Sequence, residues 1–222
     1  AVFTAKALAT IDVLSNGRVD VGIGAGWMDE EFQAIGAPPF AERGKVTDEF
    51  IRVFKELWTK DEPRYEGQYA SFRDVTFLPK PLQKPHPPIW VGGESPAALR
   101  RVIASGDAWY PIGTNPQFLL NTIERFSAGV NRLRADAVNA KRDPETIAIT
   151  YWAPWYKETQ KPIIDAGKRQ LFTGTDDDVA SDIAAFRELG VKHLLFNFTR
   201  ASLAESLAAM ERFVAAVLTR TK

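Results

Sequence analysis

Three glycines at alternate positions follow a short apolar run in VDVGIGAGW, residues 19–27. Glycines there let the backbone pass close to a phosphate or a flat ring, because no Cβ stands in the way. The dinucleotide fingerprint G-x-G-x-x-G needs one more residue than Gly22, Gly24 and Gly26 provide, and an acid about 20 positions further on. That distance falls in PPFAERGKV, the approach to a helix, so the pattern disfavours a nicotinamide site. A tight turn without a ligand is the alternative.

A second glycine pair ends the apolar run IWVGG and stands directly before a helix start. Gly92 and Gly93 end a strand, and Ser95 with Pro96 begins a helix, since serine caps helices and proline suits the first turn. The free N–H groups of a helix start attract anions, so a cofactor phosphate would fit there. A carboxylate beside a phosphate is unfavourable unless it turns away, so we weigh the backbone contacts of this loop above the Glu94 side chain. An ordinary Ser-Pro cap is the alternative.

Aromatic and acidic clusters supply further candidates. Tyr151, Trp152 and Trp155 place three rings within five residues on the loop that we expect after another strand, which favours an apolar substrate wall or core packing. The adjacent acids 29–31 are more typical of a solvated helix start than of the opposed carboxylates that a glycosidase needs. His86 and His193 have no metal-like neighbours, so we interpret both as structural and predict no metal site.

Composition sets the limits of function. The 222 residues carry no net charge, which argues against a broad nucleic-acid face, and no cysteine, which excludes disulfides and a thiolate nucleophile. No apolar run approaches the roughly 18 residues that span a bilayer. We therefore expect a cytoplasmic protein without nucleic-acid or membrane partners. The chain opens without Met and in the middle of a helical pattern, so we expect that residues precede it.

The elements that must position these residues alternate along the chain. Helices are predicted at 1–17, 40–61, 95–105, 115–140, 173–190 and 202–218, and strands begin near 18, 89, 106, 147 and 191. A small hairpin at 63–78 and a proline-rich connector at 79–88 interrupt the series. Strict alternation predicts parallel strands with crossover helices, in either a doubly wound sheet or a (β/α)8 barrel. Five strand–helix units fall three strands short of a barrel.

The order of these stretches carries a family resemblance. LATIDVLSNGRVDVGIGAGWMDEEF, PKPLQKPHPPIWVGGESPAALRRVIASGDAWYP and GTDDDVASDIAAFRELGVKHLLF together resemble the bacterial luciferase-like monooxygenase superfamily, in its single-chain coenzyme F420- or flavin-dependent oxidoreductase branch. The resemblance implies an α/β fold, a (β/α)8 TIM barrel of the luciferase-like type that lacks its first three strands here. Residues 1–222 would then form a single partial barrel domain, with the hairpin and proline-rich insertion at about 62–88.

The resemblance also implies a function. We expect an oxidoreductase or monooxygenase that moves a hydride through coenzyme F420, or alternatively FMN, to a small-molecule substrate, working as a homo-oligomer (dimer). A flavin-binding barrel without catalysis and, less favoured, a glycosidase-type hydrolase stay open as alternatives. The implied catalytic residues are unknown. The implied cofactor contacts are Gly24, Gly26, Gly92, Gly93, Glu94, Ser95 and Trp109, and the candidate substrate contacts are Trp27, Tyr151 and Trp152. Trp27 stands where the family's sugar-phosphate dehydrogenases carry an acid, which disfavours that substrate.

Overall fold

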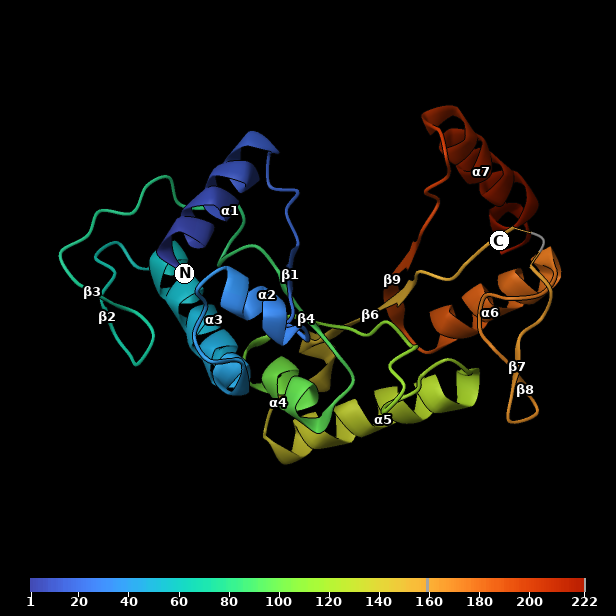
Figure 1. The fold of residues 1–222 in the computed structure, drawn as a ribbon, viewed down its shortest axis with the longest axis horizontal. Helices are drawn as coiled ribbons and strands as arrows, with labels where there is room; N and C mark the ends of the chain where they lie inside the picture. The colour runs from blue at the N-terminus through green and yellow to red at the C-terminus, as the bar shows by residue number, and fades with distance from the viewer. Residues whose placement is uncertain (159, 222) are drawn as a thin grey trace. The chain divides into compact units, whose positions relative to one another are not determined.

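The computed structural model describes residues 1–158 and 160–221 (Figure 1). The chain divides into two compact units. The first unit comprises Ala1–Gly92 with Pro96–Ala108, and the second comprises Gly93–Ser95 with Trp109 onward. The prediction of a single domain stays a prediction, and each unit is described by itself.

The first unit combines a parallel strand pair with helices. Strand β1 (Val21–Ile23) pairs in parallel with β4 (Ile89–Gly92), so that Gly22 lies opposite Trp90. Parallel strands need a crossover connection, which the intervening chain provides. The other elements are α1 (Val2–Leu14), α2 (Asp29–Ala34), η1 (Phe40–Glu42), α3 (Arg43–Thr59), the hairpin β2 (Tyr65–Glu66) with β3 (Ser71–Phe72), and α4 (Pro96–Ser105).

Helix α3 forms because its apolar residues recur at helical spacing and are buried on one side. Leu57 and Trp58 are almost fully buried, and the Trp58 indole N–H donates to the Ala5 carbonyl of α1 at 3.0 Å. Helix α1 ends where predicted, because Asn16 and Gly17 adopt positive φ values of 58° and 73°. Left-handed geometry of this kind stops a helix.

One buried carboxylate fixes the proline-rich connector to α1. Asp12 accepts hydrogen bonds from the Gln83 backbone N–H at 3.0 Å and from its side-chain amide at 2.8 Å. The same amide donates to the Val19 carbonyl at 2.7 Å, at the approach to β1. Burial would raise the pKa of Asp12, but the hydrogen bonds from Gln83 outweigh burial and lower it. The connector is therefore held beside the strand that carries the first glycine loop.

The second unit continues the alternation of strands and helices. Strand β6 (Ala148–Ala153) lies between β5 (Ala108–Tyr110) and β9 (Val191–Phe196), and it pairs in parallel with β9. The other elements are α5 (Ile123–Asn139), η2 (Pro144–Thr146), the hairpin β7 (Ile164–Asp165) with β8 (Lys168–Arg169), α6 (Asp176–Glu188), α7 (Leu203–Ala216) and η3 (Leu218–Arg220). The predicted α/β class with parallel strands is confirmed.

Aromatic rings fill the core of this unit. Phe126 of α5 stacks on Phe186 of α6 with 4.5 Å between centroids, and Tyr151 of β6 meets both rings edge-on at 4.9 and 5.0 Å. Edge-to-face and offset-stacked pairs at these distances are favourable. The cluster therefore defines the face of β6 that the helices cover.

The structure differs from the sequence-based elements at three places, the first being the short helix α2, which is not among the predicted helices. Helix α5 begins at Ile123 and not at 115, because the Thr122 hydroxyl caps it by accepting from the Arg125 N–H at 3.4 Å. The hairpin β7–β8 has no counterpart among the predicted elements. No helix in the described part of the chain combines the length and apolar character that crossing a membrane requires.

Candidate functional site

The glycine loop after β1 and the end of β4 lie at one edge of the strand pair. The register pairs Ile23 with Val91, and Gly24 and Gly92 follow these residues. The carboxyl ends of parallel strands meet at the same edge, where ligands of α/β folds bind. The structure therefore brings Gly22, Gly24 and Gly92 together.

Different structural constraints explain the glycines of this loop. A Cβ built at Gly22 or Gly24 meets no heavy atom of the described chain within 4 Å. Gly26 has φ +84°, and a Cβ there would lie 2.6 Å from the Phe32 ring, which packs edge-on against Phe40. Gly26 is thus explained by the loop's own packing, whereas Gly22 and Gly24 leave open space beside the strand.

We expect Gly26→Ala to lower the free energy of unfolding by about 1–3 kcal/mol, because alanine is strained at this φ and its Cβ overlaps Phe32. Gly24→Ala is the matched control, with an expected loss of about 0.5 kcal/mol or less at an open position. Urea denaturation followed by circular dichroism measures both. Equal losses for the two variants would contradict this assignment.

The second glycine loop turns its carboxylate into the protein. Glu94 is 7% exposed, and it accepts from the Ile112 N–H at 2.7 Å and from the Asn115 side-chain amide at 3.0 Å. Gly93 has φ +106°, a conformation that favours glycine, and its carbonyl accepts from the Trp109 indole N–H at 2.9 Å. The Glu94 side chain therefore holds the loop that follows β5, and its role as a predicted cofactor contact stays a prediction.

Two aromatic candidates lie in the core. Trp109 is 1% exposed and stacks on Phe126 at 6.1 Å, and Tyr151 is fully buried with its hydroxyl donating to the Leu120 carbonyl at 2.9 Å. Burial raises the pKa of Tyr151, so this phenol stays neutral. Tyr151 lies within β6 and not on a loop, and its strand position turns it toward the helices. The predicted contacts of these two rings with cofactor and substrate do not fit this burial.

Their neighbours in the same strands point the other way. Successive side chains of a strand alternate between its faces, so Tyr110 and Trp152 lie opposite Trp109 and Tyr151. The Tyr110 and Trp152 rings stack with 6.4 Å between centroids and 17° between planes, and both residues are half-buried. Trp152 belongs to the predicted substrate contacts. Tyr110 was not among the predicted contacts, although strand alternation could have placed it on the same face as Trp152.

Trp27, Ser95 and the acids 29–31 are further residues that the sequence analysis singled out. Trp27 is 80% exposed in the loop after β1, and Ser95 belongs to the second unit with Gly93 and Glu94. The acids 29–31 occupy the first turn of α2, as expected for a solvated helix start. Among residues 1–158 and 160–221, no group of three or more His, Asp or Glu side chains is placed to hold a metal ion.

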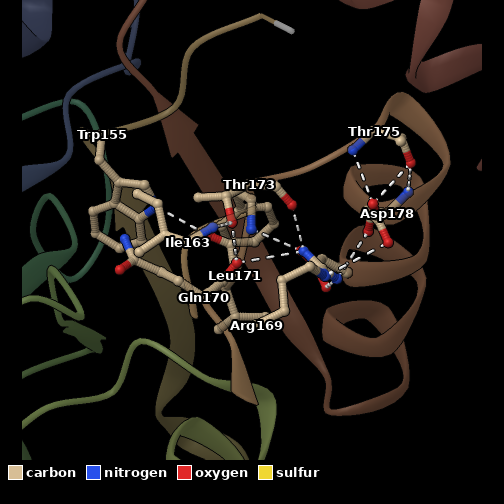
Figure 2. A network of polar contacts seen from close by, with 10 residues as sticks. Trp155, Ile163, Arg169, Gln170, Leu171, Thr173, Thr175 and Asp178 are labelled. Carbon is tan, nitrogen blue, oxygen red and sulfur yellow. Dashed lines mark hydrogen bonds and ion pairs between the residues drawn. The ribbon is translucent and has the colours of Figure 1, made fainter. Parts of the chain in front are cut away.

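The segment after β6 is tied together by a polar network that the sequence did not reveal (Figure 2). The Trp155 indole N–H donates to the Leu171 carbonyl at 2.9 Å. The Gln170 N–H donates to the Ile163 carbonyl at 2.7 Å, and the Ile163 N–H donates to the Thr173 hydroxyl at 3.1 Å. These contacts fold a long segment back on itself at the end of a strand.

Arg169 joins this segment to α6. Its guanidinium donates to both carboxylate oxygens of Asp182, at 2.9 and 2.6 Å, and to the Thr173 carbonyl at 2.7 Å. Asp182 also accepts from the Phe172 N–H at 2.7 Å. Burial raises the pKa of Asp182, and these donors oppose that shift. Figure 2 shows Arg169 between the segment and the start of α6, where Thr175 and Asp178 form a capping box.

Comparison with known proteins shows the family to which this chain is similar. Residues 1–156 match the family described as luciferase-like monooxygenase. An FMNH2-dependent dimethylsulfone monooxygenase of Pseudomonas putida is 43% identical over 241 residues, which cover 87% of this chain and 64% of that protein. The chain thus spans somewhat less than two thirds of this relative's length.

Solved structures agree with the fold. The monooxygenase RslO1 from Streptomyces bottropensis superimposes with a TM-score of 0.75 at 24% identity, covering 100% of this chain and 74% of that one. An F420-dependent secondary alcohol dehydrogenase in complex with an F420-acetone adduct gives 0.70 at 20% identity, covering 97% and 74%. These likenesses show the fold predicted from the sequence.

Proposed function

Because the chain belongs to the luciferase-like monooxygenase family, we propose that it binds a reduced flavin and takes part in the oxidation of a small organic molecule. The sequence resemblance by itself favours coenzyme F420 over FMN. The comparisons favour FMN, since the relative at 43% identity is named FMNH2-dependent and the F420 enzyme is 20% identical. We therefore propose FMN first, with F420 as the alternative.

The open space over Gly22 and Gly24 carries this proposal. Both positions lie at the edge where β1 and β4 end, and a Cβ would occupy space there that no described heavy atom fills. A planar ring needs a backbone surface of this kind, and glycine provides it without a steric penalty. Gly92 at the end of β4 extends the same edge.

A bound flavin would supply the electron chemistry of the oxidation. The residues of this chain would contribute binding and shielding. Gly22 and Gly24 would support the ring, and Gly92 at the end of β4 would extend that support. Trp27 and Met28 in the exposed loop after β1 would exclude water from the ring.

The test is a titration of the purified protein with FMN and with F420, followed by the quenching of their fluorescence. We expect binding in the unmodified chain, and about tenfold weaker binding in Gly24→Ala, because a Cβ at this point costs about 1.4 kcal/mol or more against a bound ring. The free energy of unfolding of this variant should stay within about 0.5 kcal/mol of the parent. Equal affinity of the two proteins, or no binding of either cofactor, would overturn the proposal.

A further inference from the structure

The β2–β3 hairpin of the first unit ends its ladder early, with Tyr65 opposite Phe72 as the last pair. The next pair in register would place Arg64 opposite Arg73, and like charges directly opposite one another destabilise paired strands. Asp74 follows with φ +56°, a left-handed conformation that a strand does not adopt. The two arms of the hairpin therefore do not pair beyond this point.

Both arms, residues 61–66 and 71–76, line a hollow of about 1120 Å³. This volume is slightly larger than the roughly 300–1,000 Å³ of typical small-molecule pockets. The stacked rings of Tyr65 and Phe72, with 6.1 Å between centroids, contribute an apolar part of the lining. The Arg64 side chain is 77% exposed, so the hollow is open to solvent.

The helical part of the unit holds this hairpin in place. The Glu49 carboxylate of α3 accepts from three backbone N–H groups of the turn, and the Tyr69 hydroxyl donates to the Glu42 carboxylate of η1 at 3.0 Å. The Arg64 N–H donates to the Glu56 carboxylate at 3.1 Å, which ties the first arm to α3 as well. A site that is already ordered loses less conformational freedom when it binds a ligand.

The second arm leaves its backbone unpaired. Within the described part of the chain, the backbone N–H and C=O groups of residues 73–76 take part in no hydrogen bond. Unpaired backbone groups of this kind are a template for an added strand, which is a recurring mode of peptide recognition. The arm is therefore suited to an extended peptide segment, whose backbone offers matching donors and acceptors.

The charges around the hollow favour one kind of peptide. The lining residues carry four carboxylates against two guanidinium groups, and the Arg64 guanidinium already lies 3.7 Å from the Glu62 carboxylate. Asp61, Glu66 and Asp74 supply the other three carboxylates. This excess of negative charge attracts lysine and arginine side chains, and it repels nucleic acids and acidic peptides.

We propose that the hollow binds an extended, basic segment of a partner protein. The segment adds a strand to residues 73–76, and its lysine or arginine side chains meet the carboxylates of both arms. Tyr65 and Phe72 provide apolar contact where the ladder begins. No residue of this docking surface belongs to the proposed flavin site, so the proposal goes beyond the function argued above and does not depend on it.

The probe is a fluorescein-labelled heptapeptide of alternating lysine and valine, because valine favours an extended chain. Its fluorescence anisotropy is measured as the purified protein is added. We expect saturable binding that weakens with added salt, because salt screens exposed charges. A peptide with glutamate in place of lysine should bind about tenfold more weakly. A lysine peptide that is N-methylated along its whole backbone keeps its charges but has no N–H donors, and it should also bind about tenfold more weakly.

Matched variants of the protein locate the binding. Glu62→Gln, Glu66→Gln and Asp74→Asn together remove three negative charges at exposed positions, and asparagine tolerates the left-handed conformation at position 74. This triple variant should bind the lysine peptide about tenfold more weakly than the parent. The control neutralises the acids 29–31 of α2 in the same way, and it should stay within about twofold of the parent because screening limits distant charges.

Several outcomes would overturn the proposal. These are equal losses in the two triple variants, undiminished binding of the N-methylated peptide, and the absence of saturable binding. Displacement of the probe by an equal concentration of spermine would assign the hollow to a small organic cation instead. A dimer of the chain that the probe dissociates would assign it to a second copy, and either assignment would replace the one proposed.

Discussion

Replacing Asp182 by alanine is expected to lower the free energy of unfolding by about 3–5 kcal/mol. The change removes both close carboxylate contacts of the Arg169 guanidinium, which keeps only Asp178 at 3.6 Å, and it removes the acceptor of the Phe172 N–H. Losing one partner of a buried ion pair costs more than the pair contributes, because the remaining charge stays desolvated. Urea denaturation followed by tryptophan fluorescence measures the loss.

The matched control for Asp182 is Asp136. Asp136 pairs with Arg132 one helical turn away in α5, and the side chains are 45% and 58% exposed. Exposed pairs of this kind contribute about 0.3–0.5 kcal/mol, so Asp136→Ala should change stability little. A loss below about 1 kcal/mol for Asp182→Ala would show that the Arg169 contact does not hold the segment to α6.

The second large effect is expected at Glu49, a buried carboxylate of α3. It accepts three backbone N–H groups of the β2–β3 hairpin, from Gln68 at 3.0 Å, Tyr69 at 2.7 Å and Ala70 at 2.8 Å. Glu49→Gln replaces one acceptor oxygen by a donor that faces an N–H, and we expect a loss of about 2–3 kcal/mol at pH 7. Glu62→Gln, at an 89% exposed side chain on the same unit, is the control.

The Glu49 contribution should depend on pH in a defined direction. Burial alone would raise the pKa of Glu49, but the three N–H donors outweigh burial and lower it below the usual 4.5. A group whose pKa is lowered in the folded state stabilises the fold above its unfolded pKa and loses that effect as pH falls through the folded pKa. The difference between the parent and Glu49→Gln should therefore shrink below about pH 4.5. Urea midpoints at pH 7, 4.5 and 3 test this, and a constant difference would contradict it.

Local signals made much of the fold predictable. The stop of α1 at Asn16–Gly17 and the start of α6 at Thr175 depend on residues within one turn, so the sequence alone reveals them. The start of α5 is harder to predict because residues 115–122 continue the apolar spacing. Their backbone and side chains instead bond locally, as when the Leu120 N–H donates to the Gly113 carbonyl.

The candidate site was predictable only where it depends on strand ends. The glycines of the β1 loop and Gly92 meet at one edge because parallel strands fix that edge. The choice between Trp109 and Tyr110, or between Tyr151 and Trp152, depends on which face the helices cover. Both faces of these short strands are apolar, and a shift of one residue exchanges them, so the sequence does not decide it. The Arg169–Asp182 contact joins residues 13 apart, and Arg169 belongs to β8 of a hairpin that no sequence pattern indicated.

The contact between Asp12 and Gln83 has a consequence for the integrity of the first unit. It joins residues 71 positions apart, and the chain between them includes β1, α3 and the β2–β3 hairpin. Two further hydrogen bonds connect distant residues in this part of the chain, from the Trp58 indole to the Ala5 carbonyl and from the Tyr69 N–H to the Glu49 carboxylate. A protease could therefore cleave an exposed peptide bond inside this span without separating the two fragments. The fragments would stay associated, because hydrogen bonds connect residues on the two sides of the cut.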